Sequence, residues 1–317
     1  MKNKLVSIIV LSYNNLDYIK ENLDTIIKQD YNNIELIIAD DCSKNFNTEI
    51  YKEYIKKRNK GNIRYVNIYS NKKNLGTVKN INNAISLAKG EYIKLIAADD
   101  VFYCNNTISK LIEFLQDSSE DVLVTNIEIC DEQLNTLEEY TKKNSLNSIP
   151  KEEWASPIKM YKRLAVVNFI PAPGVIFKKN FFEKFGYFDE AYTLLEDWPM
   201  WLRMCRQNQK MCYKDFISVK YRKGVGVSNT PNEKFKFDEI KCNQNEILKY
   251  KKLLGRVIYR KIKFNYILKF EYKNFSILKK IVIKIIYFDI IFYRKLKNIL
   301  ISLHKLLNNY RNKAFFI

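Results

Sequence analysis

Apolar runs and amphipathic stretches alternate along the first part of the chain. Four runs are almost continuously apolar and end on polar residues, which is typical of strands buried on both faces of a sheet. Between them lie stretches whose apolar residues recur three and four positions apart, the spacing of a helix that packs along one face. The expected strands lie within residues 5–13, 34–41, 63–69 and 92–97, and the expected helices within residues 16–27, 47–58 and 77–88.

Alternating strands and helices of this length predict an α/β fold with a doubly wound, mainly parallel sheet. In such a sheet the ligand crevice lies beyond the C-terminal ends of the strands. Tyr13, Asp41 and the pair Asp99 and Asp100 all follow strand ends, so we expect them to converge on one site.

Two residues are expected to mark helix ends in this region. Asn15 can cap the first helix with its side chain. Gly90 can end the third helix in the left-handed conformation that glycine tolerates.

The adjacent carboxylates of Asp99 and Asp100 suggest chemistry at the end of the fourth strand. Two like charges side by side repel each other unless a cation or a hydrogen-bond network lies between them. Paired hard oxygen ligands suit a Mg²⁺ or Mn²⁺ ion that carries a phosphate. The alternative is that Asp99 and Asp100 only begin a surface turn before Asn105 and Asn106. This stretch alone favours neither the metal site nor the turn.

Several familiar kinds of site are absent from the sequence. No Gly-x-Gly-x-x-Gly follows the first strand and no Gly-Lys-Ser/Thr phosphate loop occurs, so a dinucleotide fold and a nucleoside triphosphatase are not favoured. The single histidine, His304, lies in the C-terminal tail, so the body has no imidazole for a nucleophile pair. The six cysteines lack zinc-site spacing and the density of a disulfide scaffold, which indicates reduced thiols in the cytosol. Among these kinds of site, chemistry that uses the carboxylates of Asp and Glu is the one that the sequence leaves open.

The second half of the chain has one further stretch that suggests chemistry. Residues 129–150 are polar and loop-like, and the sequence FIPAPG at 169–174 predicts a bend before a short strand. Residues 196–205, EDWPMWLRMC, then predict a helix with a tryptophan-rich face. Asp197 can be the N-cap of this helix, worth about 1 kcal/mol, and capping alone would account for an acidic residue there.

The net charge of +19 is concentrated in the tail. Residues 249–317 hold 18 Lys and Arg against Glu271 and Asp289, whereas residues 1–248 hold 36 basic and 33 acidic residues. The tail has no apolar run near the ~20 residues that span a bilayer. Instead it places Lys residues with Tyr287 on one helical stripe and Ile and Phe residues on another.

This pattern predicts an amphipathic helix on an anionic membrane surface, because each basic residue near such a surface is attracted to it. Packing against the body or a second subunit is the alternative. Nucleic acid is not expected as a partner, because no usual nucleic-acid module is present and the tail is too apolar for a solvated arm.

Six blocks of the sequence, taken in order, carry a family resemblance. They are VSIIVLSYNN, IELIIADDCS, NLGTVKNINNAISLAKGEYIKLIAADD, PAPGVIFKK, FGYFDE and EDWPMWLRM, within residues 4–228. Together they resemble the family 2 glycosyltransferases with the GT-A fold, particularly the bacterial capsule and lipopolysaccharide enzymes. The resemblance implies transfer of a sugar from a nucleotide diphosphate donor, here expected to be a UDP-sugar, with inversion at the anomeric carbon and with Mg²⁺ or Mn²⁺.

The resemblance also implies roles for residues on the donor side. Tyr13 and Asp41 would hold the nucleobase with Asp40 next to them, and Asn82 falls in the block that lines the nucleotide. Asp99 and Asp100 stand at the family's Asp-x-Asp metal motif, where one of them would bind the metal and one the ribose. The first Asp of that motif is Ala97 here, so which carboxylate does which stays open.

On the acceptor side, inverting transfer needs a base that takes the proton of the acceptor hydroxyl. The resemblance points to Asp197 as this base, with Glu196 supporting it. Trp198 and Arg222 are assigned to the acceptor or diphosphate side, and a solvated loop charge is the alternative for Arg222.

We therefore expect three parts: a nucleotide-sugar-binding half (1–128), an acceptor-binding half (129–248) and a basic amphipathic helical tail for membrane-surface attachment (249–317). The expected protein is cytoplasmic, peripheral on the inner face of the cell membrane, and adds a sugar to a growing surface glycan or lipid-linked acceptor. A homo-oligomer formed through the tail is a further expectation. A non-catalytic nucleotide-sugar or glycan-binding module, and a basic membrane or nucleic-acid adaptor, are the alternatives from other classes.

Overall fold

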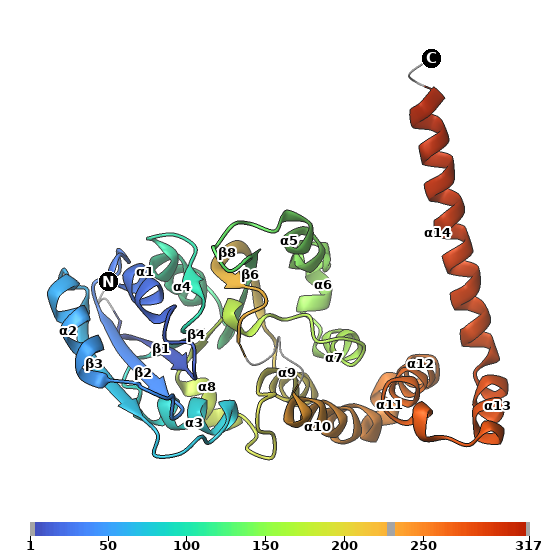
Figure 1. Ribbon diagram of the computed structural model, residues 1–317, viewed down its shortest axis with the longest axis horizontal. Helices are drawn as coiled ribbons and strands as arrows, with labels where there is room; N and C mark the ends of the chain where they lie inside the picture. The colour runs from blue at the N-terminus through green and yellow to red at the C-terminus, as the bar shows by residue number, and fades with distance from the viewer. Residues whose placement is uncertain (1–3, 227–231, 315–317) are drawn as a thin grey trace. The chain divides into compact units, whose positions relative to one another are not determined.

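The apolar runs of the sequence become strands of one eight-stranded sheet, in the order β3-β2-β1-β4-β7-β6-β8-β5 (Figure 1). The strands are β1 (Val6–Ser12), β2 (Ile34–Asp40), β3 (Ile63–Ser70), β4 (Tyr92–Ala97), β5 (Val101–Phe102), β6 (Val122–Cys130), β7 (Val175–Lys178) and β8 (Cys212–Arg222). Neighbouring strands are parallel except where β7 pairs with β4 and β6, and where β5 pairs with β8. The predicted α/β fold with a mainly parallel sheet is confirmed.

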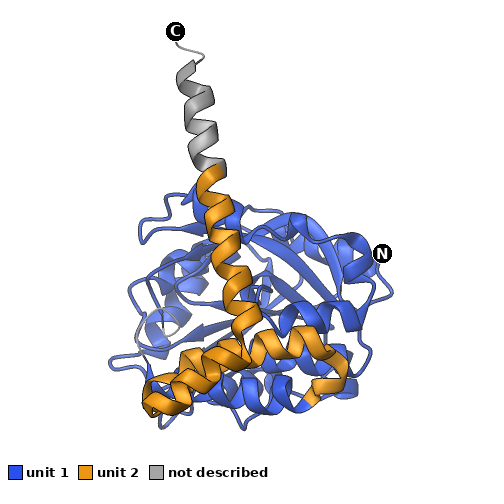
Figure 2. Ribbon diagram, turned by 90° about the vertical axis from the view of Figure 1, so that its right-hand side faces the viewer, with its two compact units in different colours: residues 1–249 blue, residues 250–317 orange. Residues whose placement is uncertain are grey.

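The computed structural model describes residues 4–226 and 232–314, and for residues 304–314 it describes the backbone alone. The chain forms two compact units, residues 1–249 and residues 250–317, coloured blue and orange in Figure 2. All eight strands belong to the first unit. The site residues predicted from the sequence therefore all lie in that unit.

Helices cover both faces of the sheet, as the alternating pattern requires (Figure 1). In the first unit they are α1 (Ile19–Ile27), α2 (Thr48–Arg58), α3 (Thr77–Leu87), α4 (Thr107–Gln116), α5 (Glu138–Asn144), α6 (Lys151–Trp154), α7 (Pro157–Leu164), α8 (Asn180–Phe185), α9 (Asp197–Arg206) and α10 (Glu233–Cys242). Helices α1, α2 and α4 share one apolar core with Ile8 and Leu36 of the sheet. On the other face, α3 contacts β1 and β2, and Trp201 of α9 stacks on Phe177 of β7. Burial on both faces explains the near-continuous apolar runs.

The parallel register brings three strand ends to one edge of the sheet. Ser12, the last residue of β1, lies beside Asp40 of β2, and Leu11 lies beside Ala97 of β4. The residues that follow these strands therefore leave the sheet next to one another, at the edge where ligands bind in such folds.

Strand β6 crosses the boundary that we expected at residue 128, and it pairs with both β7 and β8. The two expected halves consequently share one sheet. The segment 129–150, which we expected to be a loop, contains helix α5. Two glutamates begin this helix and two lysines end it, a charge order that stabilises a helix through its dipole even though the segment is polar throughout.

Gly90 does not end helix α3 in the left-handed conformation, contrary to the prediction. The helix ends at Leu87, and Gly90 is not among the residues with positive φ. Its role is a close approach between strands: a Cβ on Gly90 would lie 2.5 Å from the amide nitrogen of Ser7 and 2.9 Å from the carbonyl oxygen of Leu5. Only glycine lets the entry to β4 lie so close to β1.

The second unit is helical, which confirms the helical tail predicted from the sequence. Its helices are α11 (Lys251–Leu254), α12 (Arg256–Tyr266), α13 (Ile277–Ile286) and α14 (Phe288–Ala314). Tyr287, which we placed on the polar stripe, is instead buried between α13 and α14 and stacks on Phe264 of α12. Within the described residues, no helix is both long enough and apolar enough to cross a bilayer.

The close approach at Gly90 leads to a stability prediction. Gly90→Ala should lower the free energy of unfolding by roughly 2–3 kcal/mol, because the added methyl group overlaps backbone atoms that cannot move without disturbing β1. Gly61→Ala is a suitable control, since Gly61 has φ +96° and nothing within 4 Å of a Cβ, so only backbone strain of about 1 kcal/mol is expected. Urea denaturation of the two variants measures the difference, and equal losses would contradict the steric role of Gly90.

Candidate active site

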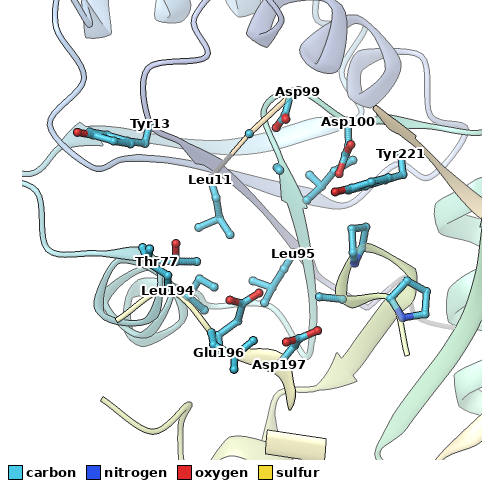
Figure 3. A pocket seen from close by; sticks show the side chains of 18 of the residues that line it. Leu11, Tyr13, Thr77, Leu95, Asp99, Asp100, Leu194, Glu196, Asp197 and Tyr221 are labelled. Atoms are coloured by element: carbon cyan, nitrogen blue, oxygen red, sulfur yellow. The ribbon is translucent and has the colours of Figure 1, made fainter. Parts of the chain in front are cut away.

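A cavity of about 730 Å³ lies at the edge of the sheet where β1, β2 and β4 end. Six of the predicted site residues line it: Tyr13, Asp41, Asp99, Asp100, Glu196 and Asp197. In Figure 3 the pair Asp99 and Asp100 lies on one side of the cavity and the pair Glu196 and Asp197 on the opposite side, with Leu95 of β4 between them. The two acidic pairs found in the sequence, almost 100 residues apart, therefore belong to one site.

Asp99 is held at the cavity wall by residues from two other segments. Its Oδ1 accepts a hydrogen bond of 3.1 Å from Nδ2 of Asn15. Gly226 approaches so closely that a Cβ there would lie 3.0 Å from Asp99 Oδ2. Burial raises the pKa of the Asp99 carboxyl group above its usual value.

Asn15 is therefore a site residue and not the helix cap that we predicted. Helix α1 begins later, at Ile19, and no side chain caps it. The Asn15 side chain also accepts a hydrogen bond of 3.2 Å from the amide of Tyr13 through Oδ1. It thus fixes the turn after β1 to the end of β4.

Asp100 is the more deeply buried of the pair, with 1% of its surface exposed. Its Oδ1 accepts a hydrogen bond of 3.0 Å from the backbone amide of Arg222, whereas its Oδ2 has no hydrogen-bond partner among the described residues. Burial, and secondly the charge of Asp99, raise the pKa of Asp100 well above its usual value.

These features fit the predicted divalent cation. Asp99 and Asp100 present hard carboxylate oxygens, the ligands that Mg²⁺ and Mn²⁺ prefer, and one of those oxygens is buried and unsatisfied. The part of the chain that the structure describes contains no group of three or more His, Cys, Asp or Glu residues placed to hold a metal. A protein site of one or two carboxylates is usual for Mg²⁺ when a substrate phosphate supplies further ligands.

Asp41 also lies on the cavity wall, where it closes the turn before α3. Its Oδ1 accepts from the amide of Leu75 and its Oδ2 from the amide of Gly76, both at 2.8 Å. Tyr13 lies at the same end of the cavity, with 40% of its surface exposed.

Asp40 and Asn82 do not reach the cavity, although we predicted that both bind the donor. Asp40 is fully buried and accepts hydrogen bonds from the hydroxyl groups of Ser43 and Ser70. Asn82 donates a hydrogen bond of 2.9 Å to the carbonyl oxygen of Phe188. Their polar atoms are therefore used to hold the walls of the site.

Arg222 and Trp198, which we assigned to the diphosphate or acceptor side, are not among the residues that line the cavity. The Arg222 guanidinium is buried, pairs with Glu21 at 2.7 Å and lies over the ring of Tyr18. The indole N–H of Trp198 donates a hydrogen bond of 2.8 Å to the carbonyl oxygen of Leu164. The polar group of Trp198 is thus satisfied inside the protein, whereas Nε and Nη1 of the buried Arg222 guanidinium have no hydrogen-bond partner among the described residues.

On the opposite side of the cavity, Glu196 and Asp197 stand where α9 begins. Asp197 is the first helical residue and not the N-cap, so the capping prediction is wrong. Its Oδ2 accepts a hydrogen bond of 2.8 Å from Nδ2 of Asn168, and its Oδ1 accepts one of 2.6 Å from the amide of Trp198. Both hydrogen bonds stabilise an ionised carboxylate.

The two carboxyl groups of this pair differ in their electrostatic surroundings. Burial and then the charge of Asp197 raise the pKa of Glu196 to about 8. Burial also raises the pKa of Asp197, but the hydrogen bonds from Asn168 and Trp198 oppose this change. The hydrogen bonds from Asn168 and Trp198 therefore favour the ionised form of Asp197, whereas Glu196 is the member of the pair that holds its proton more readily.

A loop before α9 connects the two ends of the cavity. Asp238 of α10 is buried, and its Oδ2 accepts hydrogen bonds from three successive amides, those of residues 193–195. The carbonyl oxygen of Thr193 in turn accepts a hydrogen bond of 3.2 Å from the amide of Val78, at the start of α3. A Cβ on Gly76 would lie 2.6 Å from a Thr193 methyl carbon, so the turn held by Asp41 packs directly on this loop.

Lys94, which we did not predict as a site residue, is fully buried in the middle of β4. Its ammonium group donates hydrogen bonds to the carbonyl oxygens of Leu95 and Val175 at 3.2 Å and to that of Pro173. Burial lowers the pKa of Lys94 to about 7. A charged residue inside an otherwise apolar run was the signal that we overlooked. Lys94 ties β4 to the bend at residues 171–174, which forms part of the cavity wall.

The fold is similar to that of several proteins of solved structure. The structure of residues 1–349 of TarS from S. aureus in complex with UDP-GlcNAc matches with a TM-score of 0.57 and 19% identity, over 84% of this chain and 76% of that one. The mannosyltransferase PcManGT from Pyrobaculum calidifontis, solved with GDP-Man and Mn²⁺, matches with a TM-score of 0.51 and 15% identity, over 67% and 55%. At these identities the likeness supports the GT-A-like fold alone.

Sequence relatives agree with the structural comparison. An uncharacterised glycosyltransferase of Rickettsia felis is 29% identical over 208 residues, which cover 64% of this chain but only 31% of the Rickettsia protein. WcaA of Escherichia coli K12, named for colanic acid biosynthesis, is 29% identical over 64% of this chain and 66% of its own length. A family model described as glycosyl transferase family 2 matches residues 7–186, more than half of the chain, and the protein therefore belongs to glycosyl transferase family 2.

Proposed function

We propose that this protein is an inverting glycosyltransferase that moves a sugar from a UDP-sugar to a hydroxyl group of a growing cell-surface glycan. The observation that carries the proposal is the position of two acidic pairs on opposite sides of one cavity (Figure 3). Inversion requires the base and the leaving group to act on opposite faces of the sugar ring. The cavity offers carboxylates on both sides.

The donor nucleotide binds where β1 and β2 end. The exposed ring of Tyr13 offers an aromatic face on which a nucleobase can stack, and Asp41 lies on the same part of the wall. Asn15 supports this end because it holds both the Tyr13 backbone and the Asp99 side chain.

The diphosphate binds beside Asp99 and Asp100, which would hold Mg²⁺ or Mn²⁺. A cation held there would supply positive charge to neutralise the diphosphate leaving group. Asp100 directs its unsatisfied Oδ2 to this place because its Oδ1 is fixed by the amide of Arg222. Arg222 itself acts from behind the wall, as a positioning residue.

Asp197 is the base in this proposal. Its hydrogen bonds from Asn168 and Trp198 favour the ionised form, and Asn168 holds its Oδ2 in a fixed direction. As the acceptor hydroxyl attacks the anomeric carbon, its proton passes to Asp197 while the bond between that carbon and the nucleotide diphosphate breaks. Because the pKa of Glu196 is raised to about 8, its carboxyl group is protonated at neutral pH and does not repel a negative charge on Asp197.

The classes of donor and acceptor are suggested by relatives. TarS was solved with UDP and with UDP-GlcNAc, which supports a UDP-sugar as donor, and the name of WcaA supports a surface polysaccharide as acceptor. A non-catalytic nucleotide-sugar-binding module remains the second candidate, because Ala97 lines the cavity where the family motif has its first carboxylate. Turnover by the protein distinguishes the two functions.

The first prediction concerns the metal. The unfolding temperature of the wild-type protein should rise more with UDP and Mn²⁺ together than with UDP alone. A ligand present at 100 times its Kd raises the free energy of unfolding by about 2.7 kcal/mol. Asp100→Asn should lose the part that depends on Mn²⁺ and keep its fold, because the substitution removes a buried charge without changing the size of the side chain. Asp117→Asn, at an exposed position outside the cavity, is the control. Full Mn²⁺-dependent stabilisation of a double variant, Asp99→Asn with Asp100→Asn, would refute the assignment.

The second prediction concerns the base. Asp197→Asn should lower turnover by about 10² to 10⁴ while leaving donor affinity unchanged, because only proton transfer is lost. The fold should tolerate the substitution: Asn168 Oδ1 has no hydrogen-bond partner among the described residues, so rotation of its amide lets it accept from the new NH₂ group. Glu196→Gln, which imitates a protonated Glu196, should reduce turnover much less. Similar turnover in wild type and Asp197→Asn would show that another group is the base.

The third prediction is a pH dependence of stability. Because the pKa of Glu196 is about 8 in the folded protein and 4.5 ordinarily, the folded state holds a proton that the unfolded state releases as pH rises. The stability associated with the protonated carboxyl group is therefore complete below pH 4.5 and is lost as pH rises to about 8. Glu196→Gln removes this loss, so its unfolding temperature relative to wild type should rise steadily between these pH values. A constant difference between the two proteins would contradict the raised pKa.

A further inference from the structure

Helix α13 exposes an entire apolar half in the second unit. Its outward apolar residues are Ile277, Leu278, Ile281, Val282, Ile285 and Ile286, and between 48% and 78% of each is exposed. At 3.6 residues per turn these six fall on one half of the helix. Lys279, Lys280 and Lys284 fall on the other half.

The first turns of α14 continue the exposed apolar surface. Phe288, Phe292, Leu296, Ile299 and Leu303 recur three and four positions apart, and each has between 44% and 66% of its surface exposed. We call these residues, together with the six of α13, the apolar face of the tail. Eleven large apolar side chains that are accessible on successive helices exceed what a solvated surface usually carries.

The contacts that hold α13 and α14 to α12 leave the side chains of the apolar face exposed. Tyr287, between the two helices, is buried against Phe264 of α12. Arg260 of α12 donates a hydrogen bond of 2.9 Å to the carbonyl oxygen of Ile286, and Arg294 of α14 lies over the Phe264 ring. Arg294 lies on the side of α14 opposite to the apolar face, so this contact with α12 leaves the apolar side chains of α14 accessible.

The charges around this face have one sign. The only acidic residues from residue 250 onward are Glu271 and Asp289, and Asp289 is neutralised by Arg260 at a distance of 3.0 Å. Lysines 279 and 284 are exposed beside the apolar half of α13. A lysine in this position can keep its ammonium group among lipid headgroups while its alkyl chain follows the apolar surface.

We propose that the apolar face of the tail lies in the headgroup region of an anionic lipid bilayer, with α13 and the start of α14 parallel to the membrane plane. The exposed apolar half supplies the part of the binding that does not depend on salt, and the lysines supply the electrostatic part. The described helices contain no segment able to cross a bilayer, so interfacial binding is the mode that fits them. This inference does not depend on the glycosyltransferase activity.

The test is sedimentation of the full-length protein with vesicles of phosphatidylcholine containing about 30% phosphatidylglycerol. The wild type should sediment with these vesicles at low salt and less with pure phosphatidylcholine, because each lysine near an anionic surface strengthens binding about fivefold. Ile281→Gln with Ile285→Gln should weaken binding at least tenfold at both low and high salt. Lys279→Gln with Lys284→Gln should weaken it roughly 20-fold at low salt but far less at about 500 mM NaCl, where charges are screened.

Matched variants on the first unit control for lost charge and lost apolar surface. Lys56→Gln with Lys57→Gln, and Ile50→Gln with Ile158→Gln, change exposed residues outside the tail and should leave vesicle binding unchanged. Circular dichroism verifies that each variant is folded. Absence of vesicle binding by the wild type at low salt would overturn the proposal. So would equal binding to neutral and anionic vesicles, or a stable dimer in solution that only the Ile281 and Ile285 variant dissociates.

Discussion

The burial of Asp100 is the constraint on which the arrangement of the site depends. Its carboxyl group is inside the protein with one oxygen bonded to the backbone of β8 and the other without a partner among the described residues. The hydrogen bond to the Arg222 amide fixes the end of β4 against the end of β8. Arg222 is fixed in turn by its ion pair with Glu21 of α1. Leaving a buried carboxylate oxygen unsatisfied costs free energy, and a cation with a bound phosphate would recover that cost.

A second group of contacts links the part of the cavity wall that holds Asp41 to the part that holds Asp197. The carboxylate of Asp238 accepts hydrogen bonds from three amides of the loop before α9. That loop packs on Gly76 at the start of α3. Asp41 closes the same turn from the opposite side with both of its oxygens. The positions of Asp41 and Asp197 are therefore coupled through backbone hydrogen bonds, so two residues more than 150 positions apart in sequence face the same cavity.

The two units divide the physical tasks of the protein. The first unit is almost neutral in charge and concentrates its buried carboxylates around one cavity. The second unit has few acidic residues and exposes its apolar side chains. In the two proposals made above, attachment to a surface and chemistry on a sugar therefore belong to different parts of the chain.

The sequence by itself determined the elements and the chemistry that they bear. Continuous apolar runs identified the parallel strands, because a strand buried on both faces has no polar alternation, and the polar residues after them identified Tyr13, Asp41, Asp99 and Asp100 at the cavity. Only the tertiary structure decided the use of the other polar residues. Asp40, Asn82, Trp198 and Arg222 stand next to site residues in sequence, yet their side chains turn inward and bond to the protein. Asn15, Asn168 and Asp238 serve the site although their local sequence suggested caps or nothing. The physical reason is that a polar group's role depends on which partner it meets in space, and those partners come from segments that local sequence patterns do not connect.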